Sequence, residues 1–143
     1  MSEELEETMR DSSAINGAWR IVTVAFAGDG GQATRDDGFG TDGLIIYGSS
    51  GYMTAHIVLP DRRESAASAA AQGGTGNPAH HAYFGTYTVD SVARTITHHR
   101  LANNNPGLPT DVVRSYRFLD NGCLVLSPLG GPGDQLTFER AGM

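Results

Sequence analysis

The sequence predicts an all-β fold, an eight-stranded antiparallel up-and-down β-barrel with a short helix in its third connection. Eight segments are rich in Val, Ile, Thr, Tyr and Phe, the residue types that favour extended backbone. Most of the 19 glycines fall between these segments, as a fold with many turns requires. A barrel of eight strands encloses an interior that can hold one small ligand.

The lengths of the connections indicate how the strands are arranged. The predicted strands are 17–27, 43–47, 51–59, 82–89, 93–101, 112–119, 123–127 and 134–140. Long connections follow the first, third, fifth and seventh strands, and tight turns follow the second, fourth and sixth. Alternate connections of an up-and-down barrel lie at opposite ends. We therefore expect a cup, closed at the end with the tight turns and open at a mouth bordered by long loops.

Two segments favour a helix. The third connection, 60–81, contains the run ESAASAAAQ, whose strong helix formers end at a pair of glycines. Residues 1–13 are acidic and place three apolar side chains at i, i+4 spacing, which is compatible with a frayed tail or with a short docked helix. The length of the chain predicts a single domain over 1–143.

Charge and composition exclude several classes of partner. The formal net charge of −6 argues against nucleic acid and against an anionic membrane surface. No apolar run is long enough to span a bilayer, and the acidic N-terminal segment has no apolar core of a secretory signal. Cys123 is the only cysteine, so an intrachain disulfide cannot form. We expect a cytoplasmic protein, and a homo-oligomer is compatible with the sequence.

Several segments together resemble the bacterial lipocalin-like domain family of the calycin superfamily. They are Gly17-Ala18-Trp19 followed by Arg20, then GLIIY, GYMTAHI, YFGTYTVD, TITHH, RSYRF and LTFER. The resemblance implies an eight-stranded barrel with a central pocket. It does not imply one activity, because barrels of this type serve as carriers and as enzymes.

A pair at the closed end agrees with this resemblance. Trp19 begins the first strand and Arg140 ends the last, and these strands are neighbours in a closed barrel. Arg140 is therefore expected to stack on the Trp19 ring and to seal the base through a cation–π contact. The family uses such a pair, whose role is structural.

Strand alternation predicts which polar side chains face the interior. The inward set comprises Tyr83 and Tyr87 of the fourth strand, His98 of the fifth, and Arg114, Tyr116 and Phe118 of the sixth. His98 is expected in the upper half of the cavity. Leu101 disagrees with this register, so the sequence leaves open whether His98 or His99 faces inward.

These side chains suit acid–base chemistry on a small molecule. His98 can transfer a proton near neutral pH, Tyr83 can donate to a developing oxyanion, and Arg114 can fix a carboxylate or enolate. We predict these three as catalytic residues. The predicted ligand-binding residues are Tyr116, Tyr87, His99 and Phe118. The same side chains are also compatible with a hydrogen-bond network that only holds the barrel together.

The sequence lacks the motifs of metal binding, phosphate binding and serine hydrolysis. Adjacent residues on a strand point to opposite faces, so His98 and His99 cannot bind one ion, and no Cys or Glu cluster accompanies the histidines at 80 and 81. The sequence contains neither a phosphate-binding loop nor the G-x-S-x-G motif of a serine hydrolase. We expect no metal and no cofactor.

Three functions are compatible with these observations. The first is a barrel that binds a small, largely apolar organic molecule, with a cofactor-free isomerase, cyclase or lyase as its enzymatic form. The second is a non-catalytic binding or carrier protein with the same pocket. The third is an assembly module whose barrel is filled by its own side chains. A polar interior cluster favours the first and an apolar lining favours the second.

Overall fold

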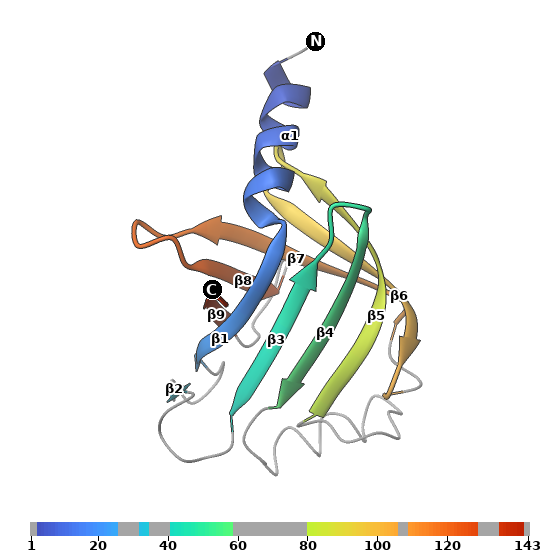
Figure 1. The fold of residues 1–143 in the computed structure, drawn as a ribbon, viewed down its shortest axis with the longest axis vertical. Helices are drawn as coiled ribbons and strands as arrows, with labels where there is room; N and C mark the ends of the chain where they lie inside the picture. Colours follow the sequence, from blue (N-terminus) through green and yellow to red (C-terminus); the bar gives the residue numbers. More distant parts are fainter. Residues whose placement is uncertain are drawn as a thin grey trace.

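The computed structural model describes residues 3–25, 32–34, 41–58, 80–105, 109–128 and 135–141, and all structural statements below concern these residues. Its elements are α1 (Glu3–Ile15), β1 (Gly17–Ala25), β2 (Gln32–Thr34), β3 (Asp42–Tyr47), β4 (Tyr52–Val58), β5 (His80–Asp90), β6 (Thr95–Asn103), β7 (Asp111–Phe118), β8 (Leu124–Pro128) and β9 (Gln135–Arg140). Consecutive strands from β3 to β9 pair antiparallel, and β1 closes the barrel by pairing with both β3 and β9 (Figure 1). The predicted eight-stranded antiparallel barrel is therefore confirmed.

Two elements differ from the expected pattern. The short strand β2 pairs with the end of β1 and was not predicted, because three residues within a Gly- and Asp-rich segment carry no alternation signal. The N-terminal segment forms the helix α1, which decides between the two alternatives for 1–13. The helix predicted within 60–81 lies outside the described residues. Among the described helical residues, none forms a stretch long and apolar enough to cross a membrane.

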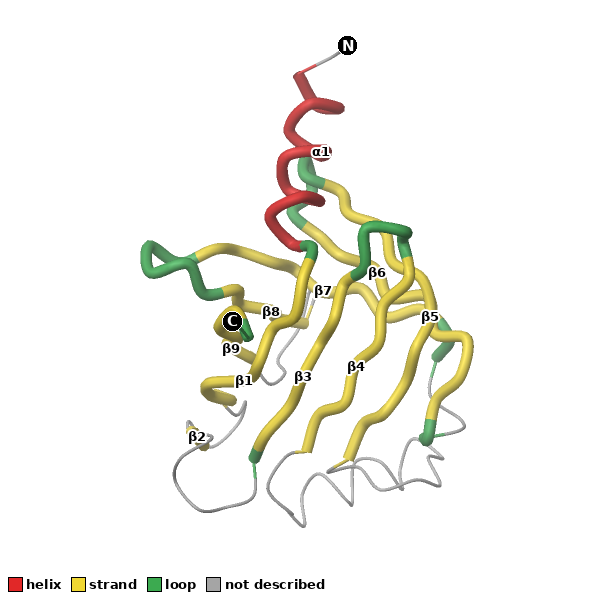
Figure 2. Tube along the Cα trace, in the orientation of Figure 1, coloured by secondary structure: helices red, strands yellow, loops and turns green. Residues whose placement is uncertain are grey.

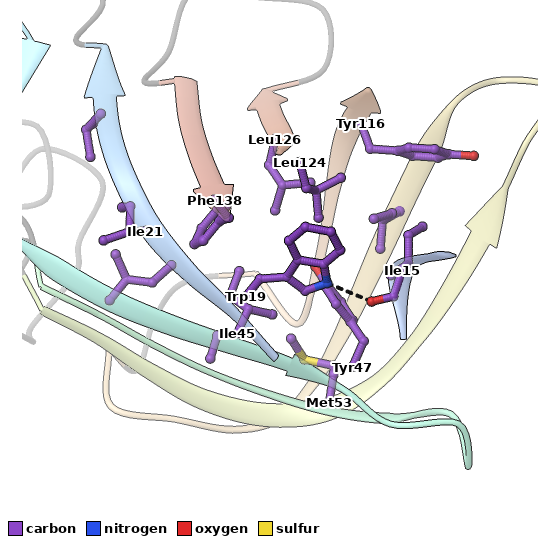
Figure 3. Close-up of a cluster of buried hydrophobic side chains, with 14 residues drawn as sticks. Ile15, Trp19, Ile21, Ile45, Tyr47, Met53, Tyr116, Leu124, Leu126 and Phe138 are labelled. Carbon is purple, nitrogen blue, oxygen red and sulfur yellow. Dashed lines mark hydrogen bonds between the residues drawn. The ribbon is translucent and has the colours of Figure 1, made fainter. Parts of the chain in front are cut away.

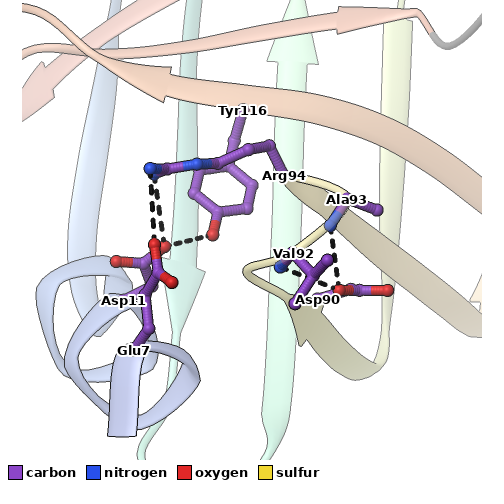
Figure 4. A network of polar contacts seen from close by, with 7 residues as sticks. All are labelled: Glu7, Asp11, Asp90, Val92, Ala93, Arg94 and Tyr116. Carbon is purple, nitrogen blue, oxygen red and sulfur yellow. Dashed lines mark hydrogen bonds and ion pairs between the residues drawn. The ribbon is translucent and has the colours of Figure 1, made fainter. Parts of the chain in front are cut away.

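Helix α1 lies at the end of the barrel that carries the tight turns 48–51 and 91–94, which we call the base (Figures 1 and 2). Asp90 accepts hydrogen bonds from two backbone amides of the β5–β6 turn, and Arg94 ends this turn in the left-handed region with φ 58°. From there Arg94 forms ion pairs with Glu7 at 3.5 Å and with Asp11 at 3.6 Å on α1 (Figure 4). The acidic face of the helix is thereby held against the base.

The interior of the base is filled by apolar side chains around Trp19 (Figure 3). The Trp19 ring is 1% exposed, and its Nε1–H donates to the carbonyl oxygen of Ile15 at 2.7 Å. The guanidinium carbon of Arg140 lies 4.4 Å from the centre of this ring. The predicted cation–π pair is confirmed, and Arg140 also donates to the carbonyl oxygens of Ala14 and Asn16 at the end of α1.

Buried and exposed side chains alternate along the strands, and the buried ones form the inner wall as expected. In β4, Met53, Ala55 and Ile57 are buried while the residues between them are exposed. Phe138 is fully buried in β9, and Leu136 packs against the core. A period of two residues thus separates the inner from the outer face along these strands.

Gly85 is predicted to be essential for the pairing of β5 with β6. The two strands carry an irregularity between Phe84 and Gly85, and a Cβ atom at Gly85 would lie 1.9 Å from the His99 carbonyl oxygen. Gly85→Ala should therefore lower the free energy of unfolding by about 2–3 kcal/mol, measured by denaturant titration. Thr88→Ala, at an exposed position of the same strand, is the control and should change it by about 0.5 kcal/mol or less. An equal effect of both substitutions would contradict this prediction.

Candidate functional site

A chain of three hydrogen-bonded side chains lies in the barrel interior and is the candidate site. The Tyr47 hydroxyl lies 2.6 Å from Nε2 of His98, and the Tyr83 hydroxyl lies 2.8 Å from Nδ1 of the same ring. The three residues belong to β3, β6 and β5, so the barrel brings together positions that are far apart in the sequence. We call this set the tyrosine–histidine chain.

The structure decides the register of β6. His98 is 1% exposed and faces inward, whereas His99 faces outward. The His99 ring lies 3.1 Å from the Thr88 hydroxyl and 3.1 Å from an oxygen of Asp111. Leu101, which disagreed with this register, is 63% exposed on the outer wall.

The height of His98 differs from expectation. It is the fourth of nine residues in β6, counted from the base, and it bonds to Tyr47, the last residue of β3 at the base. The expected position in the upper half is therefore wrong. The reason is that β6 begins at Thr95 and continues to Asn103, two residues further toward the mouth at each boundary than predicted.

Burial and nearby positive charge keep His98 neutral. Removal from water is the main cause that lowers the pKa of His98 from 6.5 to about 3, and the charges of Arg114 and Arg100 lower it further. Burial also raises the pKa of Tyr47 and Tyr83, so both hydroxyls keep their protons at neutral pH. At neutral pH the chain therefore consists of three uncharged groups.

The hydrogen bonds define a direction within this chain. A neutral imidazole has one N–H donor and one acceptor nitrogen. Among the described residues, His98 is the only hydrogen-bond partner of the buried Tyr47 hydroxyl. A buried O–H without an acceptor is costly, so we infer that Tyr47 donates to Nε2 and that Nδ1–H of His98 donates to Tyr83. The Tyr83 hydroxyl then keeps its own proton for another acceptor.

Two arginines border the tyrosine–histidine chain, and we call Arg100 and Arg114 the interior arginines. Arg100 is 8% exposed, its Nη2 donates to the Pro109 carbonyl oxygen at 2.6 Å, and its guanidinium carbon lies 5.1 Å from the centre of the Tyr83 ring. Arg114 is half-buried on the same face of β7 as the buried Tyr116. Both charges influence the pKa of Tyr83.

Of the three residues predicted as catalytic, the structure brings His98 and Tyr83 into direct contact and places the charge of Arg114 near them. Two members of the candidate site, Tyr47 and Arg100, were missed. Alternation could have found both, since Tyr47 follows the buried Ile45 by two residues and Arg100 follows His98 by two.

The four predicted ligand-binding residues lie in different parts of the barrel. Tyr116 donates its hydroxyl to Asp11 of α1, and Tyr87 donates to Asn16 and to the Gly48 carbonyl oxygen at the base. Phe118 packs 6.4 Å from the Trp19 ring, measured between ring centres. His99 lies on the outer wall. Of these four residues, the structure brings Tyr87 next to the tyrosine–histidine chain, because its ring centre lies 4.9 Å from that of Tyr47 and it pairs with His98 across β5 and β6. It does not bring the other three there, and helix α1, absent from the predicted site, supplies the hydrogen-bond partner of Tyr116.

The described residues contain no group of three or more His, Cys, Asp or Glu side chains that could hold a metal ion. His56 and His80 form an exposed pair on the outer wall, with their Nε2 atoms 2.6 Å apart and their rings stacked at 4.6 Å. Two nitrogens are fewer than the three or four ligands of a zinc site.

Comparison with known proteins agrees with the architecture. A protein-family model described as a lipocalin-like domain matches residues 16–130, which include β1 to β8. No curated protein matches the chain. The lipocalin-like barrel supports the binding of small molecules in general. The chain belongs to the lipocalin-like domain family.

Proposed function

We propose that the barrel binds a small, largely apolar organic molecule in a central cavity and that Tyr83 donates a hydrogen bond to an oxygen of this molecule. The observation that carries the proposal is the contact of Tyr47 and Tyr83 with the two ring nitrogens of the buried His98, from which the direction of the tyrosine–histidine chain is inferred. His98 occupies the Tyr83 oxygen as an acceptor, so the Tyr83 proton is available to a ligand. A few placed polar groups in a mostly apolar pocket are a common means of fixing a ligand.

His98 acts through Tyr83 in this proposal. Tyrosine hydroxyls lie within hydrogen-bond distance of both of its ring nitrogens, which leaves neither nitrogen for a ligand. Its pKa of about 3 also removes it from the range in which a general base works well at neutral pH. His98 is therefore a positioning residue that orients the Tyr83 hydroxyl.

The same geometry serves two related functions. In a cofactor-free isomerase, cyclase or lyase, Tyr83 would stabilise a developing oxyanion, with Arg114 adding positive charge. In a carrier protein, Tyr83 would only hold an oxygen of the ligand. The low pKa of His98 and the raised pKa of Tyr47 and Tyr83 favour the carrier, because none of these three groups exchanges a proton readily near pH 7. Turnover and a cytoplasmic location stay predictions.

The proposal predicts how Tyr83→Phe changes binding. The fluorescent probe phenylnaphthylamine should bind in the apolar interior, and methyl naphthyl ketone should displace it. Loss of the Tyr83 hydroxyl should weaken binding of the ketone about three- to tenfold, the usual contribution of one hydrogen bond, while binding of the probe stays unchanged.

The control is Tyr52→Phe, because Tyr52 is 58% exposed on the outer wall. This variant should bind the ketone as the unmodified protein does. If neither the probe nor the ketone binds, the barrel is not a small-molecule container, and the proposed function is wrong. If the ketone binds equally to both variants, Tyr83 is not its hydrogen-bond donor.

A further inference from the structure

We propose that the ligand is an organic anion whose negatively charged oxygen, a carboxylate or enolate, lies between Arg100 and Arg114, with its apolar part filling the rest of the interior. This inference rests on the proposed function, because it names the chemical class of the molecule held in the same cavity. It adds Arg100 and a charge requirement to the single hydrogen bond of Tyr83.

Arg100 is the first observation. Its side chain is 8% exposed on the inward face of β6, two residues from His98. One of its nitrogens bonds to the Pro109 carbonyl oxygen, but its buried Nε has no hydrogen-bond partner among the described residues. Leaving a buried donor unsatisfied costs about 1–3 kcal/mol, and more for a charged group. An anionic oxygen at this position would satisfy both the donor and the charge.

Arg114 is the second observation. It lies on the inward face of β7, in a strand that pairs with β6. Its positive charge contributes to lowering the pKa of His98 and Arg100, in agreement with its place on the inward face of this strand. Two like charges in one interior repel each other, and an anion between them removes this repulsion.

The described carboxylates do not provide this anion. Their ion pairs join Asp42 to Arg20, Glu7 and Asp11 to Arg94, and Asp111 to His99. These pairs lie on the outer wall and at the base, and none in the described part of the chain includes Arg100 or Arg114. Among the described residues, the two interior arginines therefore have no carboxylate as ion-pair partner, although the protein has a net charge of −6.

The remaining interior surface defines the rest of the ligand. Ile57 of β4 is 8% exposed and Leu136 of β9 is partly buried against the core, whereas Val24 of β1 is 0% exposed and lies within that core. All three lie in the parts of their strands away from the base. Apolar walls with a few charged groups select an amphiphilic molecule, since the walls favour apolar surface and the arginines orient the charged oxygen.

A matched pair of ligands tests this inference. Naphthoate and naphthylmethanol share one ring system and differ in charge, and each is titrated against bound phenylnaphthylamine at low ionic strength. The unmodified protein should bind naphthoate at least about tenfold more tightly than naphthylmethanol. Arg100→Gln and Arg114→Gln should each remove most of this preference and leave the affinity for the alcohol nearly unchanged.

Arg117→Gln is the control, because Arg117 lies on the exposed face of the same strand as Arg114 and its loss changes the net charge equally. It should preserve the preference for naphthoate. If Arg100→Gln fails to fold through loss of its bond to Pro109, Arg114→Gln alone carries the comparison. Equal affinities for both ligands in the unmodified protein would overturn the inference and leave the proposed function intact, whereas binding of neither ligand nor probe would overturn both.

Discussion

Trp19→Ala should lower the free energy of unfolding by about 3–5 kcal/mol, the largest loss that we expect from a single substitution in this protein. The ring is 1% exposed at the centre of the base core. Its removal leaves a cavity between the strands and α1, and it also ends the hydrogen bond to Ile15 and the stacking of Arg140. Denaturant titration and thermal unfolding measure this loss.

Trp19→Phe separates the loss of apolar volume from the loss of the hydrogen bond to Ile15. It keeps most of the apolar volume but removes the Nε1–H donor to Ile15, so it should cost less than Trp19→Ala. Neither variant alters the tyrosine–histidine chain directly, and a variant that folds should still bind phenylnaphthylamine. Unchanged thermal stability of Trp19→Ala would contradict the prediction that Trp19 and Arg140 stabilise the closed end of the barrel.

Acid should destabilise the protein through His98. Between about pH 6.5 and pH 3, His98 of the unfolded chain binds a proton, whereas folded His98, whose pKa is about 3, does not. The unfolded state therefore binds more protons in this window, and the contribution of His98 to stability is lost as the pH falls from 6.5. The loss amounts to at most about 1.4 kcal/mol for each pH unit.

His98→Gln tests this contribution because it removes the titrating group from the interior. Free energies of unfolding measured from pH 7 to pH 3 should fall less steeply in this variant than in the unmodified protein. His99→Gln replaces the same residue type on the outer wall and should keep the steep dependence. Equal slopes for the unmodified protein and His98→Gln would show that His98 is protonated in the folded state.

Much of the barrel could be predicted from local patterns. Alternation in the segment from Tyr83 to His99 predicted a hairpin with Tyr83 on its inner face and favoured His98 over His99 there, and the structure has Tyr83 and His98 inside. The contact between Trp19 and Arg140 followed from closure, because the first and last strands of a closed barrel must pair. These features depend on a period of two residues and on strand order, which a sequence displays directly.

The composition of the site depended on contacts that no local pattern contains. Alternation indicates the face of a side chain but not the partner across the interior, so the pairing of Tyr47 with His98, 51 residues apart, was not foreseen. Tyr116 faces inward as predicted, yet Asp11 of α1 accepts the hydrogen bond from its hydroxyl. Residues 1–13 alone did not decide between helix and tail, because Arg94 and Tyr116 hold α1 through tertiary contacts.

By itself, the sequence determined the barrel, the order of its strands and most of the side chains that face its interior. Only the tertiary structure decided which of these side chains meet and whether they carry charge. The pKa of a histidine depends on its burial and on neighbouring charges, and both arise only when β5, β6 and β7 pack around it. His98 is therefore neutral near pH 7, because burial and the charges of the interior arginines lower its pKa while Tyr47 and Tyr83 contact its ring nitrogens.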